Sequence, residues 1–226
     1  MPPALIIFDC DGVLIDSESL CDRVVSAELT RQGWPLTPEA CHSRFLGLTF
    51  ADIQATAEAH LARSLGLGWI DRLITQVTAV MAQEVEPIPG ARTALEGTAE
   101  LGLPYRIASN SSRAEMDAKF TRTGLAALIP QDRIHSAYDL IALGKRGKPD
   151  PDLFLEAAAA EGVPPAACVV IEDSLAGIRA AVTAGMTCWG YAPESDGERL
   201  RQAGALPFTS MFAIPSLLRP LLHGLA

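Results

Sequence analysis

The amino-acid sequence predicts an α/β protein with a doubly wound parallel sheet and an all-helical domain inserted after the first strand. Residues 4–8 form an uninterrupted apolar run, which is typical of a strand buried on both faces. Residues 16–85 contain helix-like segments and no convincing β-branched run. Beyond residues 87–90, strand-like and helix-like segments alternate, which is the pattern of a parallel sheet covered by helices.

Local signals support each predicted element. The first helix can be capped by Asp16 or Ser17, has apolar residues at helical spacing and ends at Gly33. Pro38 favours a helix start close to residue 37. The predicted elements are helices at 16–33, 37–45, 49–65 and 69–86, then helices at 91–101, 113–124, 151–162 and 175–185 with strands at 104–108, 134–137, 168–171 and 187–191, and last a short apolar helix within 210–226.

This change of pattern divides the chain into two predicted domains. Residues 1–15 and 88–226 form the α/β core, and residues 16–87 form a helical cap domain inserted into it. A chain of 226 residues has room for one large domain with such an insertion.

The composition is that of a globular protein with an excess of negative charge. Apolar residues make up 49% and charged residues 20%, and 18 Lys and Arg against 27 Asp and Glu give a net charge of −9. A field of that sign repels nucleic acid and anionic membranes, so we expect neither as a partner. The odd set of five cysteines has no CxxC pair, which favours reduced thiols. Without a signal peptide or an apolar run of about 20 residues, we expect a cytoplasmic protein, monomeric by default.

Polar side chains follow three predicted strands where each strand ends, and a basic segment precedes a further helix. Sites in open parallel sheets form outside the carboxyl ends of the strands. Acids at that edge can hold a metal ion, and hydroxyl, backbone and ammonium groups can hold a phosphate. The candidate residues are Asp9 and Asp11 after the first strand, Ser109 and Asn110 after the strand at 104–108, Glu172 and Asp173 after the strand at 168–171, and Lys148 in the basic segment.

Asp9 and Asp11 stand where the backbone must turn. Side chains alternate along a strand, but a turn at its end lets two acids converge on one metal or substrate. Gly12 allows that turn to be tight and brings backbone N–H groups close to an anion. A calcium loop of the EF-hand type is excluded, because Val13 and Leu20 are apolar where such a loop needs oxygen ligands or an acid.

Each motif also has a purely structural interpretation. The first two acids could cap a turn, the serines of residues 109–112 could cap a helix, and the later acidic pair could complement a helix dipole. Lys148 could be a solvated loop residue. For the whole set to be structural, these interpretations would all have to hold at four separate junctions before helices. Asp16 is expected to cap its helix, Cys10 to pack in the interior, and the four histidines to lie at the surface or in the core.

The ordered set of motifs resembles the haloacid dehalogenase-like (HAD) hydrolase superfamily. The segments are FDCDGVLIDSE, ASNSS, GKPDPDLF and IEDSLAGI. They are similar to the branch that contains sugar-phosphate phosphatases and β-phosphoglucomutase, and the resemblance covers nearly the whole chain. It implies a Rossmann-like core with a helical cap inserted just after the first motif.

The resemblance also implies the catalytic roles. Asp9 would be the nucleophile that forms an aspartyl phosphate, which divides one difficult displacement into two easier ones. Asp11 would be the general acid for the leaving alkoxide and then the base for the hydrolytic water. Ser109 and the amide of Asn110 would bind the phosphoryl oxygens, and Lys148 would neutralise their charge and bridge to Asp9.

A magnesium ion is the implied cofactor. The carboxylate of Asp9, the backbone carbonyl of Asp11 and Asp173 would hold Mg²⁺, with Glu172 in contact directly or through water. Mg²⁺ favours oxygen ligands and keeps several waters, so a small set of protein ligands is adequate.

Within the superfamily, the residues favour a phosphatase that acts on a small phosphorylated metabolite such as a sugar or polyol phosphate. A haloacid dehalogenase would need neither Asp11 nor the later acidic pair. A β-phosphoglucomutase-like phosphomutase is the alternative, although such mutases carry a His where Cys21 stands and an Arg at the position of Phe50. A binding module that has lost its activity is a further alternative.

The cap domain is expected to choose the substrate. Residues 44–49 have the small-residue bend of a loop that faces the site. Arg44 could meet a carboxylate or a second phosphate on the substrate, or form a salt bridge within the cap. Glu18 could contact substrate hydroxyls. We expect the cap to close over the substrate and exclude bulk water, as lids commonly do.

Overall fold

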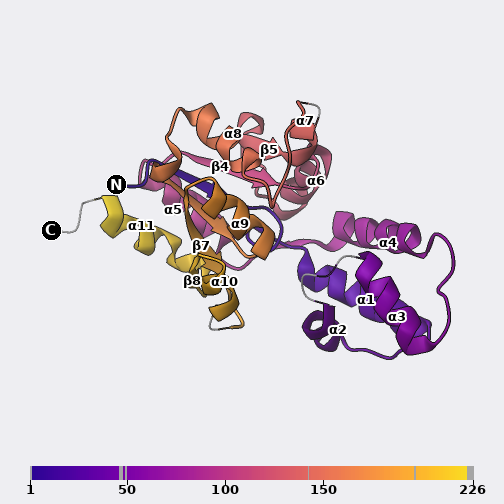
Figure 1. Cartoon of the computed structure of the whole chain (residues 1–226). Coiled ribbons are helices and arrows are strands. Elements are labelled where there is room, and N and C mark those ends of the chain that lie inside the picture. Colours follow the sequence, from indigo (N-terminus) through magenta and orange to yellow (C-terminus); the bar gives the residue numbers. More distant parts are fainter. Residues whose placement is uncertain (1, 46–47, 49, 142, 196, 223–226) are drawn as a thin grey trace. The chain divides into compact units, whose positions relative to one another are not determined.

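The chain divides into two compact units (Figure 1). One unit is formed by Met1–Ile15 together with Pro87–Ala226, and the other by Asp16–Glu86. The short strands β2 (Ile15–Asp16) and β3 (Glu86–Pro87) form a two-stranded sheet where the chain passes between them. The computed structural model describes residues 2–45, 48, 50–141, 143–195 and 197–222.

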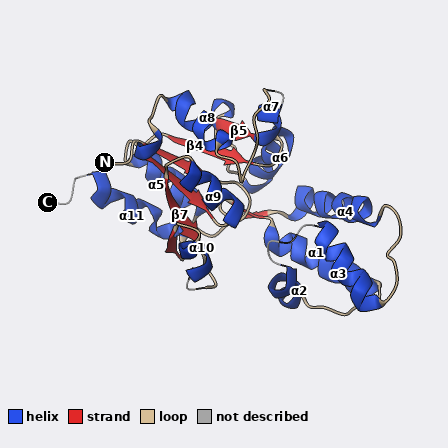
Figure 2. Cartoon of the chain, in the orientation of Figure 1, coloured by secondary structure: helices blue, strands red, loops and turns tan. Residues whose placement is uncertain are grey.

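The first unit is built on one six-stranded sheet in which every pair of neighbours is parallel (Figure 2). From one edge to the other, the strands are β5 (Ile134–Ser136), β4 (Tyr105–Ser109), β1 (Leu5–Phe8), β6 (Cys168–Glu172), β7 (Thr187–Tyr191) and β8 (Leu206–Phe208). Strand β1 is fully buried, as its continuous apolar sequence predicts for a strand covered on both faces.

Helices connect these strands and flank the sheet. Several begin directly after a strand, so the start of the helix and the end of the strand share one loop. The α-helices of this unit are α5 (Ala91–Glu100), α6 (Arg113–Thr123), α7 (Ala137–Ile141), α8 (Asp152–Glu161), α9 (Leu175–Thr183), α10 (Glu198–Gln202) and α11 (Ile214–Leu222), and its 3₁₀ turns are η1 (Gln131–Arg133), η2 (Pro165–Ala167) and η3 (Met211–Ala213).

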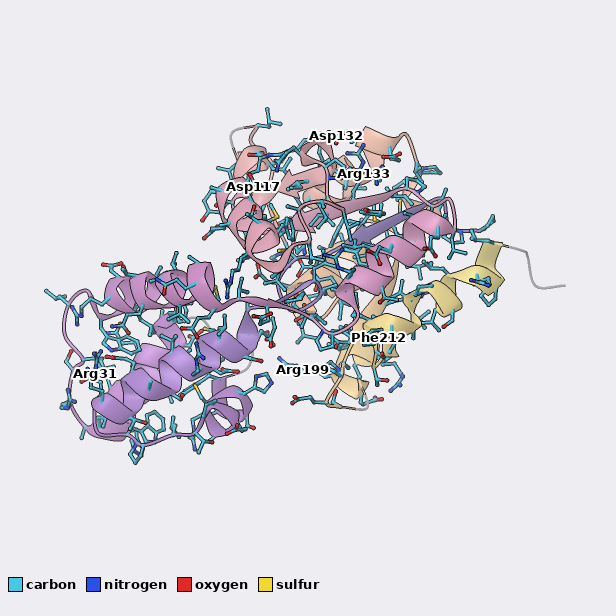
Figure 3. All side chains as sticks on the ribbon, turned by 180° about the vertical axis from the view of Figure 1, so that it is seen from behind. Arg31, Asp117, Asp132, Arg133, Arg199 and Phe212 are labelled. Atoms are coloured by element: carbon cyan, nitrogen blue, oxygen red, sulfur yellow. The ribbon has the colours of Figure 1, made fainter. Side chains whose placement is uncertain are left out.

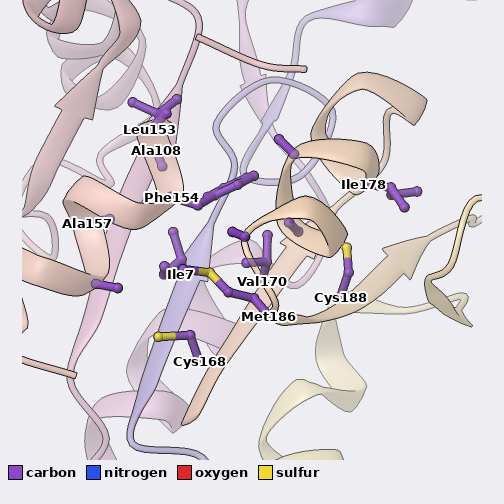
Figure 4. Close-up of a cluster of buried hydrophobic side chains, with 14 of the residues drawn as sticks. Ile7, Ala108, Leu153, Phe154, Ala157, Cys168, Val170, Ile178, Met186 and Cys188 are labelled. Atoms are coloured by element: carbon purple, nitrogen blue, oxygen red, sulfur yellow. The ribbon is translucent and has the colours of Figure 1, made fainter. Parts of the chain in front are cut away.

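A buried apolar cluster joins the central strands to α8 and α9. Ile7 of β1 and Val170 of β6 lie in this cluster with Leu153 and Phe154 of α8 and Ile178 of α9 (Figure 4). Fully burying a side chain of this size contributes about 1.5–3 kcal/mol. This packing holds the central strands in place, and it therefore also holds the loops at their carboxyl ends.

The unit Asp16–Glu86 is helical and has its own apolar core. Trp69 is fully buried there, and its Nε1 donates to Oε1 of Glu28 at 2.9 Å. Leu29 and Leu73 are buried in the same cluster. The helices are α1 (Glu18–Arg31), α2 (Pro38–Phe45), α3 (Phe50–Leu61) and α4 (Trp69–Glu84).

The predicted α/β fold is confirmed, but several short elements differ from the prediction. Ala137, predicted as the end of a strand, begins the helix α7, which was not predicted. Sequence analysis did not predict β8 or the short helix α10. Pro207 stands in the middle of β8, and proline argues against a strand unless that strand lies at an edge, as β8 does. Thr49 and residues 223–226, which belong to two predicted helices, lie outside the described residues.

The structure bears on two expectations from the composition, which concern membrane-spanning segments and the cysteines. Among the described helices, none has the length and apolar character needed to cross a membrane. The five cysteines are free thiols, and burial raises the pKa of Cys10 well above its ordinary value.

Candidate active site

The candidate site lies at the carboxyl edge of the three central strands. Phe8 at the end of β1 pairs with Ile107 of β4 and with Ile171 of β6. Residues that follow these strands therefore emerge at one edge, as expected for sites in open parallel sheets. Asp9 leaves β1 there, and Glu172 is the last residue of β6.

A buried ammonium group joins two carboxylates at this edge. Nζ of Lys148 lies 2.5 Å from Oδ1 of Asp9 and 2.7 Å from Oε1 of Glu172. The side chains of Lys148, Asp9 and Glu172 are only 4%, 10% and 0% exposed. Charges buried so deeply persist only when they are paired and hydrogen-bonded. The three side chains therefore act as one electrostatic unit.

Burial and pairing act in opposite directions on these groups. Burial raises the pKa of Asp9, the ammonium of Lys148 opposes that shift, and Glu172 adds to it. Burial lowers the pKa of Lys148, but the two carboxylates outweigh it, so this pKa lies above its ordinary value and Lys148 stays an ammonium. A second cation close to Asp9 would favour its ionised form.

Three acids offer carboxylate oxygens within reach of a single cation. One oxygen each from Asp9, Glu172 and Asp173 lies within 4.8 Å of the others. Gly12 makes room for this arrangement, because a Cβ there would lie 2.0 Å from Oδ2 of Asp173, and its φ of +77° favours glycine. A donor set made of carboxylates suits a hard divalent cation. These residues fit Mg²⁺.

The side chain of Glu172 also orders the loop that carries Asp173. Its Oε2 accepts hydrogen bonds from the backbone N–H groups of Asp173 at 3.0 Å and Ser174 at 2.8 Å, and from the Ser174 hydroxyl at 2.9 Å. Ser174 in turn caps α9 by accepting from the N–H of Gly177 at 3.0 Å. Helix capping and a ligand role for the acidic pair are therefore compatible.

The loop after β4 is linked to the segment that carries Lys148. Nδ2 of Asn110 donates to the carbonyl of Lys148 at 3.0 Å, and its Oδ1 accepts from the N–H of Lys148 at 2.9 Å. Ser109 is buried, and its Oγ accepts from the N–H of Ser111 at 3.1 Å. Ser112, and not Ser109, caps α6 through a capping box. The side chain of Asn110 thus holds the Lys148 backbone, a contact that the sequence did not predict.

Sequence analysis also missed Lys119, which binds the carboxylate of Asp11. Nζ of Lys119 lies 2.7 Å from Oδ1 and 2.9 Å from Oδ2 of Asp11, and the Ser111 hydroxyl donates to Oδ2 at 2.8 Å. The available signal was its place on the helix, because Lys119 shares the buried face of α6 with Met116 and Phe120. A lysine on an apolar helix face implies a buried acidic partner.

The two predicted cap residues belong to the other unit. Glu18 begins α1, and Arg44 lies near the end of α2. The guanidinium of Arg44 is 5.3 Å from the ring centroid of Trp34, which stacks on His60 at 4.0 Å. Their roles toward a substrate stay predictions. Residues 46, 47 and 49 of the predicted bend lie outside the described residues.

The other residues considered from the sequence make local contacts. Oδ1 of Asp16 accepts from the N–H of Ser19 at 3.2 Å, a contact of the expected capping kind. Nδ1 of His42 lies 2.7 Å from Oδ2 of Asp22. His135 lies against Arg106 in the α/β unit, and His223 lies outside the described residues.

The parallel sheet, the order of the motifs and the acidic edge together indicate a hydrolase with a Rossmann-like core. A family model described as haloacid dehalogenase-like hydrolase matches residues 3–185. The chain belongs to that family, as its motifs predicted.

Named relatives and a solved structure agree with this membership. The 6-phosphogluconate phosphatase of Escherichia coli (strain K12) is 27% identical over 213 residues, which cover 94% of this chain and 93% of that protein. Hexitol phosphatase A of the same organism is 29% identical over 202 residues, which cover 87% and 86%. The crystal structure of a HAD family hydrolase from Deinococcus radiodurans R1 with bound phosphate and sodium has a TM-score of 0.83 and 32% identity, covering 98% of this chain and 95% of that chain. The prediction of a HAD-like phosphatase is confirmed at the level of the family and its named relatives.

Proposed function

We propose that this protein is a magnesium-dependent phosphatase that hydrolyses a small sugar or polyol phosphate through an aspartyl-phosphate intermediate. The observation that carries the proposal is the buried ammonium of Lys148, 2.5 Å from Asp9 and 2.7 Å from Glu172. A cation so placed beside a carboxylate can stabilise the charge of a phosphoryl group that this carboxylate attacks. The relatives named 6-phosphogluconate phosphatase and hexitol phosphatase A support the substrate class.

In the first half of the proposed reaction, a carboxylate oxygen of Asp9 forms a bond to phosphorus. The bond between phosphorus and the alkoxide oxygen breaks, and Asp11 gives its proton to that oxygen, so the sugar leaves as an alcohol. The hydroxyl of Ser109 and the backbone N–H of Asn110 bind the phosphoryl oxygens. Oriented donors of this kind stabilise charge with little reorganisation. The N–H of Gly12, which the sequence predicted to lie close to an anion, donates instead to the carbonyl of Ile15 at 2.8 Å.

In the second half, a water molecule attacks phosphorus and the bond to Asp9 breaks. The carboxylate of Asp11 takes a proton from this water, which restores the acid for the next turnover. The products are inorganic phosphate and the free Asp9 carboxylate, beside which Lys148 keeps its ion pair.

The acids at the edge would hold the metal ion. Asp9, Asp173 and the backbone carbonyl of Asp11 would be its ligands, and Glu172 would support them directly or through water. When bound, Mg²⁺ supplies further neutralisation of the phosphoryl charge. Glu172 also fixes the loop of Asp173, so its removal would disturb the ligand geometry as well as the charge.

We assign residues 1–15 and 88–226 to the catalytic core and residues 16–87 to a cap that selects the substrate. In the cap, Arg44 is proposed to meet a substrate carboxylate or second phosphate, and Glu18 to meet hydroxyls. The contact between Arg44 and Trp34 competes with this role. Arg44→Ala tests it: unchanged kcat/KM across a set of sugar phosphates would reject the role of Arg44.

The experiment for the proposed function is phosphate release from a set of sugar and polyol phosphates and from p-nitrophenyl phosphate, with and without Mg²⁺. Wild-type protein should release phosphate only with the ion, and Asp9→Asn should be inactive on every substrate. Asp71→Asn, at an exposed position of α4, is the matched control and should behave as wild type. Equal activity of wild type and Asp9→Asn would reject the catalytic assignment.

The same set of substrates distinguishes the phosphatase from the phosphomutase. A phosphatase transfers the phosphoryl group to water, whereas a mutase returns it to another hydroxyl of the sugar. Cys21 and Phe50 stand where mutases of this type carry His and Arg, and this difference favours transfer to water. Isomerised sugar phosphate in place of free phosphate would reverse that choice.

A further inference from the structure

The pair of Lys119 and Asp11 adds a second ammonium to the candidate site. The side chain of Lys119 is only 10% exposed, and its Nζ lies within 2.9 Å of both oxygens of Asp11. A charge-assisted contact to both oxygens fixes the orientation of a carboxylate more firmly than one neutral hydrogen bond would.

Contacts at the start and in the middle of α6 hold this helix, which carries Lys119, in place. The capping box of Ser112 fixes the start of α6, and Ser111 just before it donates to Oδ2 of Asp11 at 2.8 Å. Farther along, Oδ1 of Asp117 accepts from Nε2 of Gln131 at 2.7 Å, which ties α6 to η1. Figure 3 labels Asp117 on α6 and Asp132 and Arg133 on that turn. Lys119 therefore projects from a supported helix.

We propose that Lys119 is a positioning residue that holds the carboxylate of Asp11 for the second half of the reaction. This inference rests on the proposed function. In that half, the oxygen of water bonds to phosphorus, the bond from phosphorus to Asp9 breaks, and the proton of water passes to Asp11. A base must be held within hydrogen-bond reach of the proton it takes. In the first half, a substrate with a good leaving group needs little help from an acid.

The proposal predicts a step-specific defect in Lys119→Met. With p-nitrophenyl phosphate and Mg²⁺, stopped-flow measurement should show a burst of one equivalent of p-nitrophenol as Asp9 is phosphorylated. Steady-state turnover should then be at least about tenfold slower than in wild type, part of the ~10²–10⁴-fold that a positioned acid or base contributes. The value of kcat/KM, which reports only steps up to phosphoenzyme formation, should be nearly unchanged.

Three further variants separate positioning from structural support. Lys119→Arg keeps a cation near Asp11 and should recover part of the turnover. Ser111→Ala removes a single donor and should show a weaker form of the same defect, so the test does not depend on the folding of Lys119→Met. Lys145→Met, at an exposed lysine paired with Glu156 at 2.5 Å, should turn over as wild type.

The outcomes are distinguishable. If Asp11→Asn shows the burst and slow turnover while Lys119→Met and Ser111→Ala turn over as wild type, the inference about Lys119 is wrong and the proposed function stands. If Lys119→Met loses kcat/KM and turnover equally and Lys119→Arg recovers neither, Lys119 serves structure only. If Asp9→Asn retains the burst, the proposed function itself is wrong.

Discussion

The ammonium of Lys148 lies 2.5 Å from Oδ1 of Asp9, and both side chains are almost completely buried at the carboxyl edge of the sheet. The same ammonium is 2.7 Å from Glu172 and 4.9 Å from the ring centroid of Phe154. Removing one member of a buried ion pair leaves its partner charged without compensation, which is strongly destabilising. The Lys148 contact therefore links the stability of this edge to its proposed chemistry.

Lys148→Met is expected to lower both the stability of the protein and its phosphatase activity. The free energy of unfolding should fall by about 3–5 kcal/mol, because Asp9 and Glu172 lose their buried cation. The value of kcat should fall by about 10²–10³-fold, the range for loss of one preorganised group that stabilises transition-state charge. Denaturant unfolding in the presence of a chelator and phosphate release with Mg²⁺ measure the two effects. Lys145→Met is the control, and a variant with wild-type stability and kcat would contradict the assignment of Lys148.

Removal of the metal ion is expected to abolish activity, and Mg²⁺ is expected to restore it. Asp173→Asn should raise the Mg²⁺ concentration for half-maximal activity by at least about 10–100-fold, the effect typical of losing even a residue that only orients the ligands of a metal site. Because a ligand that binds the native state stabilises it, Mg²⁺ should also raise the melting temperature of wild type more than that of the variant. Identical calorimetric titrations of the two proteins with Mg²⁺ would show that Asp173 is not a ligand of the ion.

Gly12 is expected to matter through its contact with Asp173 as well as through its backbone. Gly12 and Gly102 have φ of +77° and +73°, but a Cβ meets Asp173 only at Gly12, and nothing lies within 4 Å of one at Gly102. Alanine at either position should destabilise the protein by about 1–2 kcal/mol, since both conformations are left-handed. Only Gly12→Ala should also lose Mg²⁺-dependent activity. Equal activity in the two variants would show that the Asp173 contact has no role.

Acid is expected to destabilise the protein partly through His135. Burial and the guanidinium of Arg106 lower the pKa of His135 from 6.5 to about 4. As the pH falls from 6.5 to 4, the unfolded chain therefore binds this proton before the native protein does, and stability decreases. Urea unfolding over this range should show a smaller loss in His135→Gln than in wild type. Parallel curves for the two proteins would contradict the assigned shift.

Much of the fold could be predicted because its signals are local. The buried run that became β1 is continuous and apolar, and the strand predicted at residues 187–191 has the same bounds as β7. The motifs at the ends of β1, β4 and β6 meet because parallel strands present their carboxyl ends at one edge. Residue type and strand order were enough to predict which side chains share that edge.

The contacts that hold the site together could not be predicted in this way. Lys119 is 108 positions from Asp11 along the chain, and the Asn110 side chain reaches the backbone of Lys148 across 38 positions. Such contacts depend on the packing of helices and loops, and no local spacing encodes them. The signal that remains is indirect: a lysine on the buried face of α6 requires a buried partner, without saying which.

Asp9 carries the phosphoryl group between substrate and water in the proposed mechanism, so its phosphorylated form is the species to trap. Asp11→Asn should be mixed with p-nitrophenyl phosphate and Mg²⁺, quenched in acid, digested and examined by mass spectrometry. We expect one phosphoryl group on Asp9 that hydroxylamine removes, and none in the Asp9→Asn, Asp11→Asn double variant. Full turnover by wild type, with no phosphoryl group found on Asp9 in the trapping variant, would contradict the proposed mechanism.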